Sequence, residues 1–265
     1  MNTVSVIMGI YNCSETLPEA IGSLLNQTYP NWELVMCDDG SADSTFQVAE
    51  QYQRKHPDRI LLLRNDRNMG LNYTLNKCLD AARGEYIARM DGDDLCDSTR
   101  LEKQVRFLDA HPEYAIVSSA MTHFDEAGTF RLTQPKPFPQ VMDLVRGNPF
   151  CHAPAMIRAE AYRAVGGYTV DRRMLRVEDV NLWFKLYAAG YRGHNLQEPL
   201  YSMRDDRNAA ARRKFRYRIH SAYTRIMGFR MLKIPLRYYP LAFRPILVGL
   251  LPGPVYRCLH RWKES

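Results

Sequence analysis

Residues 3–41 have the sequence TVSVIMGIYNCSETLPEAIGSLLNQTYPNWELVMCDDGS, which contains a complete strand–helix–strand unit. Residues 3–9 and 32–37 are short apolar runs rich in β-branched side chains, the pattern of strands that are buried on both faces. Between them, Ser14 is a candidate N-cap, and Leu17, Ile21, Leu24 and Leu25 follow at helical spacing. This stretch therefore predicts two neighbouring parallel strands joined by a helix.

The same alternation continues beyond this unit. Strands are expected at residues 59–64 and 86–90, and helices at residues 43–55, 71–82 and 99–110. Short connections between alternating strands and helices predict an α/β fold with a mostly parallel, doubly wound sheet. The second half is less regular, with strands expected at 115–118 and 155–157, an extended segment at 134–139, and helices at 142–147 and 179–189.

The composition is that of a globular protein. Hydrophobic residues make up 46% of the 265 positions and charged residues 25%, which excludes a disordered, collagen-like or coiled-coil chain. The six cysteines are scattered without a CxxC or zinc-finger spacing. Together with the lack of a signal-peptide pattern at Met1, this predicts reduced thiols and a cytoplasmic location.

Charge is distributed unevenly along the chain. Residues 207–265 carry 14 Lys and Arg against one acid, Glu264, whereas residues 1–206 carry 22 bases and 28 acids. The longest uncharged stretch of this tail, residues 245–256, is 12 residues long, and about 20 are needed to cross a bilayer. We expect interfacial helices on the anionic cytoplasmic face of a membrane, because residues 246–251 are too apolar for a nucleic-acid groove. A helical subdomain packed on the acidic body is the alternative.

Polar clusters follow three of the predicted strands: Tyr11-Asn12, Asp38-Asp39 and the DGDD sequence at residues 91–94. Ligands of open α/β sheets bind beyond the carboxyl ends of the strands, so these clusters predict a site at that edge. Asp91 and Asp93 offer hard oxygen ligands that suit Mg²⁺ or Mn²⁺. A solvated acidic turn that caps the next helix is the alternative.

The Asp38-Asp39-Gly40-Ser41 turn also has two interpretations. Asp, Gly and Ser are common turn formers, so a tight turn into a helix explains them. Alternatively, Asp39 accepts a hydrogen bond from a bound nucleotide, as acids at strand ends do in doubly wound folds. Tyr11 would then stack on the base, although a tyrosine at a strand end often serves packing alone.

These motifs, taken in order, resemble the family 2 glycosyltransferases, which have the GT-A fold. The resemblance covers residues 4 to 204 and rests on the YN and QTYPNWE sequences, DDGS, ARGEYIA, DGDD and VEDVNLWFKL. One departure is Gly9-Ile10, where many members have a proline shortly before the YN pair. The family implies inverting transfer of a sugar from a nucleotide-sugar donor, a UDP-sugar being favoured, to a hydroxyl of a glycan or lipid-linked acceptor. Bacterial surface polysaccharide or glycolipid synthesis is the implied setting.

The resemblance also implies roles for individual residues. It implies that Asp93 binds the metal directly, that Asp91 serves the ribose or a metal-bound water, and that Asp179, or less favourably Glu178, is the general base. His152 falls in a segment that faces the acceptor side. Residues in the nucleotide-sugar pocket would be Tyr11, Asn12, Glu15, Asp39, Asn68, Asn76 and Asp91.

The implied organisation is a catalytic domain at residues 1–206, with a donor half at 1–98 and an acceptor half at 99–206, followed by the basic extension 207–265. Two other functions compete. A nucleotidyltransferase would need a phosphate loop rich in glycine and lysine, and the GIYNCSETL sequence of residues 9–17 has no lysine. A non-catalytic protein of the same fold is disfavoured by the intact Asp39, Asp91, Asp93 and Asp179.

Overall fold

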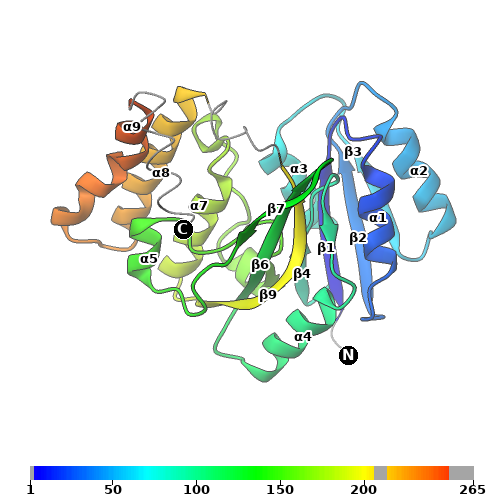
Figure 1. Ribbon diagram of the computed structural model, residues 1–265, viewed down its shortest axis with the longest axis horizontal. Coiled ribbons are helices and arrows are strands. Elements are labelled where there is room, and N and C mark those ends of the chain that lie inside the picture. Colours follow the sequence, from blue (N-terminus) through cyan, green and yellow to red (C-terminus); the bar gives the residue numbers. More distant parts are fainter. Residues whose placement is uncertain (1–2, 206–213, 251–265) are drawn as a thin grey trace.

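A nine-stranded sheet runs through the computed structural model, which describes residues 3–205 and 214–250 (Figure 1). The strand order is β3-β2-β1-β4-β8-β6-β9-β5, and β7 pairs with β6. The strands are β1 (Val4–Ile10), β2 (Trp32–Asp38), β3 (Ile60–Arg64), β4 (Tyr86–Arg89), β5 (Leu95–Cys96), β6 (Ile116–Asp125), β7 (Gly128–Thr133), β8 (Met156–Arg158) and β9 (Gly193–Arg204).

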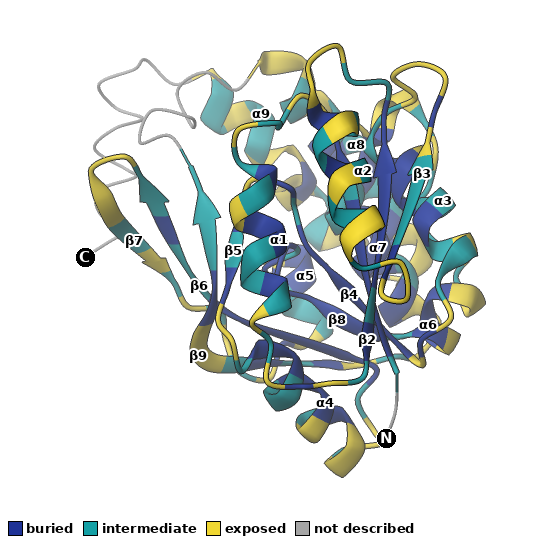
Figure 2. Ribbon diagram, turned by 90° about the vertical axis from the view of Figure 1, so that its right-hand side faces the viewer, coloured by how far each residue is buried: buried dark blue, intermediate teal, exposed yellow. Residues whose placement is uncertain are grey.

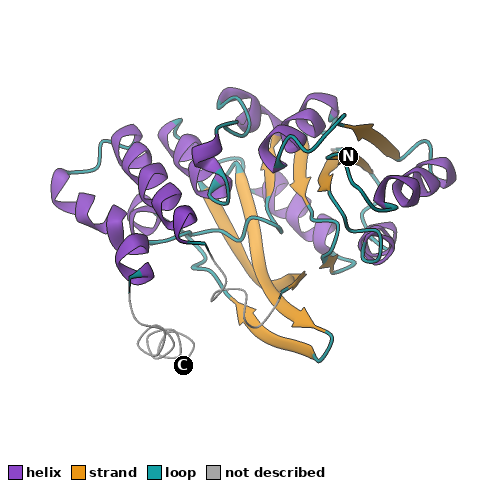
Figure 3. Ribbon diagram, turned by 90° about the horizontal axis from the view of Figure 1, so that it is seen from above, coloured by secondary structure: helices purple, strands orange, loops and turns teal. Residues whose placement is uncertain are grey.

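Helices cover both faces of the sheet (Figure 3). One face packs on α1 (Leu17–Leu25), α2 (Thr45–Lys55) and α4 (Arg100–Ala110). The other face packs on α3 (Leu71–Ala81), α5 (Val141–Arg146), α6 (Ala159–Ala164) and α7 (Glu178–Ala188). The central strands are consequently buried on both sides (Figure 2), which explains why the sequence of β1 is almost continuously apolar.

The N-terminal half of the sheet is parallel, as predicted. Strand β1 pairs in parallel with β2 and β4, and β2 pairs in parallel with β3. The register places Ile10 opposite Asp38. The polar residues that follow β1, β2 and β4 therefore meet at one edge of the sheet.

The other half of the sheet is mixed rather than mostly parallel. Strand β8 runs antiparallel to both β4 and β6, and β5 runs antiparallel to β9, whereas β6 and β9 pair in parallel. The sequence did not predict β5, β7, β9 or α6. Strand β9 alternates buried and exposed residues irregularly, and β5 has two residues, so pairing with neighbours rather than local pattern determines both.

Helix α1 begins at Leu17, three residues after the predicted cap. The Ser14 backbone N–H donates to the Asp43 carboxylate at 3.2 Å, and the Cys13 N–H donates to Thr45 Oγ1 at 2.8 Å. These bonds hold residues 11–16 as a loop against the turn that follows β2. Pro18 then lies in the first turn of the helix, where its missing N–H costs nothing.

The C-terminal segment packs on the body through α8 (Phe215–Met231). Phe229 is fully buried, and its ring meets that of Phe184 on α7 edge-on at 6.0 Å between centroids. Gly228 lies so close to Phe184 that a Cβ atom would be 2.2 Å from its ring. A one-turn helix η1 (Arg172–Met174) precedes α7, and the chain continues beyond α8 into η3 (Leu236–Phe243) and α9 (Arg244–Gly249).

Two of the predictions concern residues that lie partly outside the described ranges. The proposed domain boundary at residue 206 and the end of the tail beyond residue 250 fall there, as does Cys258. Within residues 3–205 and 214–250, no helix has the length and apolarity that crossing a membrane requires.

Candidate functional site

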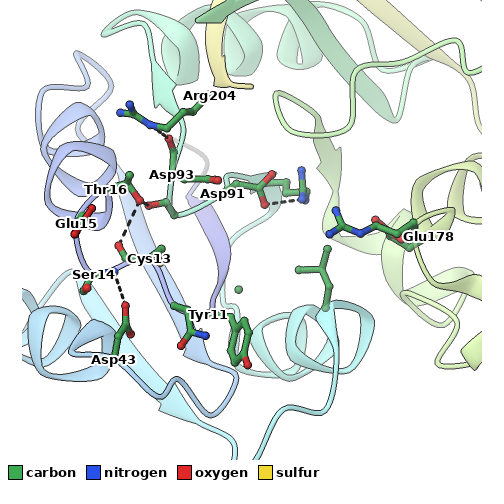
Figure 4. A pocket seen from close by; sticks show the side chains of 16 residues that line it. Tyr11, Cys13, Ser14, Glu15, Thr16, Asp43, Asp91, Asp93, Glu178 and Arg204 are labelled. Carbon is green, nitrogen blue, oxygen red and sulfur yellow. Dashed lines mark hydrogen bonds and ion pairs between the residues drawn. The ribbon is translucent and has the colours of Figure 1, made fainter. Parts of the chain in front are cut away.

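An open cavity of about 720 Å³ lies at the carboxyl edge of the parallel strands (Figure 4). Its walls come from the loop after β1, the turn after β4, the end of β9 and the start of α7. A smaller cavity of about 280 Å³ adjoins it and shares Gly9, Tyr11, Leu71, Arg176 and Glu178. We call the two cavities together the cleft. Of the predicted site residues, they bring together Tyr11, Asn12, Glu15, Asp39, Asn68, Asp91, Asp93 and Glu178.

The loops after β1 and β2 are tied to each other. The Asn12 N–H donates to Ser41 Oγ at 3.0 Å, and Asn12 Oδ1 accepts from the Ala42 N–H at 2.9 Å. Asn12 adopts a left-handed conformation, with φ of 49°, which asparagine tolerates better than most residues. Gly40 has φ of 72°, and a Cβ there would lie 2.6 Å from the Arg67 carbonyl carbon. Tyr11 is left 48% exposed at the cleft.

Asp39 organises the loop on the other side of the smaller cavity. Its Oδ1 accepts from the Met69 N–H and from Asn65 Nδ2, each at 2.8 Å, and its Oδ2 accepts from the Gly70 N–H at 2.9 Å. Because a carboxylate oxygen can accept two hydrogen bonds, Oδ2 keeps capacity for a ligand donor. Asn68 lies in the loop that these bonds hold, and it lines the same cavity.

The three aspartates of the DGDD turn have different surroundings. Asp91 Oδ1 pairs with Arg89 Nη2 at 2.6 Å, an ion pair drawn in Figure 4. Asp94 is buried and accepts from the Tyr201 hydroxyl at 2.9 Å and the Arg204 N–H at 2.8 Å, and burial raises its pKa to about 8. Asp93 projects into the cleft, where desolvation and the nearby Asp91 carboxylate raise its pKa. Asp94 is therefore held inside the protein by its hydrogen bonds, whereas Asp93 faces the open cleft.

The carboxylates of the DGDD turn fit a divalent ion that completes its coordination with oxygen atoms of the substrate. In residues 3–205 and 214–250, no group of three or more His, Cys, Asp or Glu side chains forms a ready-made metal cage. Asp93 and Asp91 nevertheless present hard carboxylate oxygens at the cleft. Mg²⁺ is commonly bound by one or two carboxylates together with substrate phosphates, which is the arrangement that this cleft can provide.

Glu178 and Asp179 open helix α7 but point into different environments. Glu178 lines both cavities of the cleft, and burial together with the adjacent Asp179 carboxylate raises its pKa to about 6, against the opposing effect of Arg89 and Arg176. Asp179 Oδ2 accepts from Asn148 Nδ2 at 2.5 Å, and Asp179 is not among the residues that line the cleft. Glu178 is therefore the carboxylate of this pair that lines the cleft, whereas the resemblance favoured Asp179 as the base.

Asn76 and His152 are not among the residues that line the cleft. Both polar atoms of the Asn76 amide bond to the backbone of Tyr168, each at 2.8 Å, and Asn76 lies outside the cleft. His152 Nε2 is 2.9 Å from the Tyr168 hydroxyl, and burial and Arg89 hold its pKa well below the usual value. Both residues position the segment around Tyr168 rather than lining the cleft.

Three arginines complete the cleft. Arg176 lines both cavities of the cleft, and Arg89 and Arg204 line the larger one. Arg204 Nε donates to the Asp93 carbonyl at 3.1 Å, and its Nη2 pairs with Glu19 at 2.6 Å. Arg89 was missed. It is buried, and its Nε has no hydrogen-bond partner among the described residues. The sequence did contain a signal for it, because a charged residue within an otherwise apolar strand is rarely buried without a partner.

Comparison with known proteins identifies the family of this chain. Residues 5–166 match the family model described as glycosyl transferase family 2. The putative glycosyltransferase EpsE of Bacillus subtilis is 46% identical over 260 residues, which cover 97% of this chain and 93% of that protein. The UDP-Glc:alpha-D-GlcNAc-diphosphoundecaprenol beta-1,3-glucosyltransferase WfaP of Escherichia coli is 27% identical over 195 residues, 74% of each chain.

A solved structure shares the fold. The mannosyltransferase PcManGT from Pyrobaculum calidifontis, in complex with GDP-Man and Mn²⁺, matches with a TM-score of 0.66 and 20% identity, over 99% of this chain and 79% of that one. This likeness confirms the GT-A fold that the motifs implied.

Proposed function

Because this chain belongs to glycosyl transferase family 2, we propose that its cleft transfers a sugar, with inversion, from a nucleoside-diphosphate sugar to an acceptor hydroxyl. The observation that carries this proposal is that one cavity contains Asp91, Asp93 and Glu178 and opens into a second cavity that contains Tyr11 and Asp39. The proposed proton acceptor, the proposed metal site and the proposed nucleobase site are thereby adjacent.

The smaller cavity is suited to the nucleoside. Tyr11 offers an exposed ring for stacking, and Asp39 Oδ2 has capacity to accept from a base N–H. Uracil presents such an N–H beside its carbonyl groups, so a UDP-sugar suits this cavity and is the donor that we propose. Asn68, Gly70 and Thr74 are among the other residues that line this cavity.

The diphosphate would lie between the DGDD turn and the arginines. Asp93 and Asp91 would hold Mg²⁺ or Mn²⁺, which neutralises the charge of the leaving diphosphate when bound. Arg204, anchored by the Asp93 carbonyl and Glu19, and Arg176 present further positive charge at the same cavity. Arg89 holds Asp91 in place through its short ion pair.

Glu178 would act as the general base. The acceptor oxygen attacks the anomeric carbon from the side opposite the diphosphate, and the bond from carbon to phosphate oxygen breaks as the new bond forms. The electron pair leaves with the nucleoside diphosphate, and the acceptor proton passes to Glu178. A single displacement of this kind inverts the anomeric centre, and a positioned base contributes typically about 10²–10⁴-fold.

The acceptor class is proposed from relatives. WfaP is named for a diphosphoundecaprenol acceptor, so we place this chain in bacterial polysaccharide or glycolipid synthesis, acting on a lipid-linked or glycan hydroxyl. The strongly basic C-terminal segment would then hold the enzyme peripherally on the cytoplasmic face of the membrane.

A thermal-shift screen of UDP-, GDP-, dTDP- and CMP-sugars, each with and without Mn²⁺, tests donor binding. A ligand at 100 times its Kd stabilises the folded state by about 2.7 kcal/mol, which is a readily measured shift in Tm. We expect the largest shift with a UDP-sugar and Mn²⁺. Absence of any shift across the panel would contradict the proposed function.

A further inference from the structure

The C-terminal helices expose apolar side chains among basic ones. Residues 214–250 contain eight Lys and Arg and no Asp or Glu. Although Phe229 is buried on the body, Phe215 and Ile219 of α8 are 43% and 49% exposed, and Leu247 and Leu250 at the end of the segment are 61% and 67% exposed. Soluble domains rarely leave apolar side chains of this size grouped together without a partner.

These side chains belong to one continuous surface. A Cβ atom on Gly249 would lie 3.2 Å from Phe215 Cε2, and Arg218 Nη1 donates to the Pro245 carbonyl at 3.3 Å, so α9 lies against the start of α8. Leu247 and Leu250 are close to Gly249 in the sequence, so the exposed side chains at this end of the segment belong to an element that packs against the start of α8.

The surface continues from α8 towards the cleft. Arg216 and His220 line a groove of about 630 Å³ together with Val170, which is 58% exposed. The groove shares Gly70 and Leu71 with the smaller cavity of the cleft. We call this surface the docking face, defined by Val170, Phe215, Arg216, Ile219, Leu247 and Leu250.

We propose that the docking face lies on an anionic lipid bilayer and that the cleft opens beside the membrane surface. The proposal rests on the proposed function in one respect, namely that the acceptor is lipid-linked. Apolar side chains surrounded by Lys and Arg match the chemistry of an interface where acyl chains meet anionic headgroups. The hydroxyl of a lipid-linked acceptor would then reach Glu178 while the lipid chain stays in the bilayer.

The observations favour a bilayer over an acidic protein partner. The exposed apolar side chains come from the loop before η1, from α8 and from α9. A bilayer accepts apolar groups from several elements without a matching shape, whereas a stable protein interface requires close complementarity over its core. The lack of acids throughout residues 214–250 also fits a uniformly anionic surface.

The proposal combines the two hypotheses for the C-terminal segment, a packed subdomain and a membrane surface. Packing of α8 on α7 buries Phe229, as a helical subdomain would. A membrane-bound segment would instead need a surface that is both basic and apolar, and the residues of the docking face provide such a surface. A folded subdomain would thus present a preformed membrane surface rather than a tail that folds on binding.

Co-sedimentation of the full chain with vesicles tests this inference. Phosphatidylcholine vesicles containing phosphatidylglycerol should bind the protein, and pure phosphatidylcholine vesicles should bind it much more weakly. The double variant Ile219→Glu/Leu247→Glu should lower affinity for the anionic vesicles by at least about tenfold, since it removes apolar insertion and adds repulsion. Val170→Glu, on a different element, should weaken binding in the same direction.

The matched control is Leu132→Glu/Phe138→Glu, because these side chains are 55% and 54% exposed outside the docking face. This control should bind anionic vesicles like the unmodified chain. All variants should keep the donor-induced shift in Tm, so a failure of donor binding is distinguishable from a failure of docking. If the unmodified chain ignores anionic vesicles at low salt, or if both double variants bind equally, the inference is overturned and an acidic protein partner takes its place.

Discussion

Glu178 and Asp179 are neighbouring carboxylates with the same local sequence context, and tertiary surroundings separate their roles. Glu178→Gln should lower transfer by about two to four orders of magnitude while donor binding persists, because it removes the proposed base and little volume. Asp179→Asn is the matched change, and it should cost far less because Asp179 bonds to Asn148 rather than lining the cleft. Transfer and donor affinity measured on both variants check this. A larger loss for Asp179→Asn would return the base to the residue that the sequence favoured.

The raised pKa of Glu178 predicts the acid side of the pH profile. The base must be ionised, and burial and Asp179 raise its pKa to about 6, so kcat/KM should increase through pH 6 and then level off. The titration of an ordinary glutamate would place this rise below pH 5. A profile measured with saturating metal, in the unmodified chain and in Glu178→Gln, tests the assignment. The rise through pH 6 should be absent from the residual activity of the variant.

Asp93 faces the cleft, whereas Asp94 is bonded on both oxygens, so the two should respond differently to substitution. Asp93→Ala should abolish most Mn²⁺-dependent donor affinity and transfer without changing Tm of the free protein. Asp94→Ala should instead lower Tm, because the Tyr201 hydroxyl and the Arg204 N–H lose a buried acceptor, at a cost of about 1–3 kcal/mol. Calorimetric titration of UDP with and without Mn²⁺ on both variants separates these effects. Normal metal dependence in Asp93→Ala would exclude it as a ligand.

The sequence predicted most of the cleft because strand ends of a parallel sheet converge whatever their exact length. Tyr11, Asp39, Asp91 and Asp93 were located on this basis. The sequence could not show which of Glu178 and Asp179 lines the cleft, or where the Asn76 side chain lies. Both depend on the rotation of a helix about its axis and on the backbone groups that face it. Arg89 was missed for a related reason, since its role comes from a carboxylate two residues away in an unusual buried setting.

Among the elements, local pattern sufficed where a strand is buried on both faces or a helix has a clear apolar side. Strands β1 to β4 and helices α1 to α4 were therefore predicted to within a few residues. Strand β9 was not, because its 12 residues include exposed polar ones and its conformation depends on pairing with β6 and β5. The mixed half of the sheet follows from such non-local pairings.

The contact between α7 and α8 can be tested with a glycine. Gly228→Ala should destabilise the protein by about 1–3 kcal/mol, since the added Cβ would lie 2.2 Å from the buried Phe184 ring. Gly22→Ala in α1 is the control, because no atom lies within 4 Å of a Cβ built there and alanine favours a helix by about 1 kcal/mol. Chemical denaturation should give opposite signs for the two variants. Equal effects would show that α8 is not held against α7.

Across the whole chain, charge and packing connect the C-terminal segment to the cleft. The acidic body and the basic segment carry opposite net charge, and α8 also supports the residues that precede α7. His220 Nδ1 lies 3.2 Å from the Leu175 carbonyl, and Thr224 Oγ1 contacts the Met174 sulfur at 3.3 Å. Leu175 lines the smaller cavity, so α8 supports part of the wall of the proposed donor site.

Removal of the C-terminal segment should therefore affect more than membrane binding. A chain that ends at Asp205 exposes Phe184, whose burial alone contributes about 1.5–3 kcal/mol, and it releases the support under Met174 and Leu175. We expect a lower Tm, weaker UDP affinity and no binding to anionic vesicles. A chain that ends at Leu250 keeps α8 and α9 and should retain the Tm and the UDP affinity of the full chain, because the packing of α8 on α7 is intact. If the chain ending at Asp205 kept both the Tm and the UDP affinity of the full protein, α8 would be an appendage, and the donor site would be complete without it.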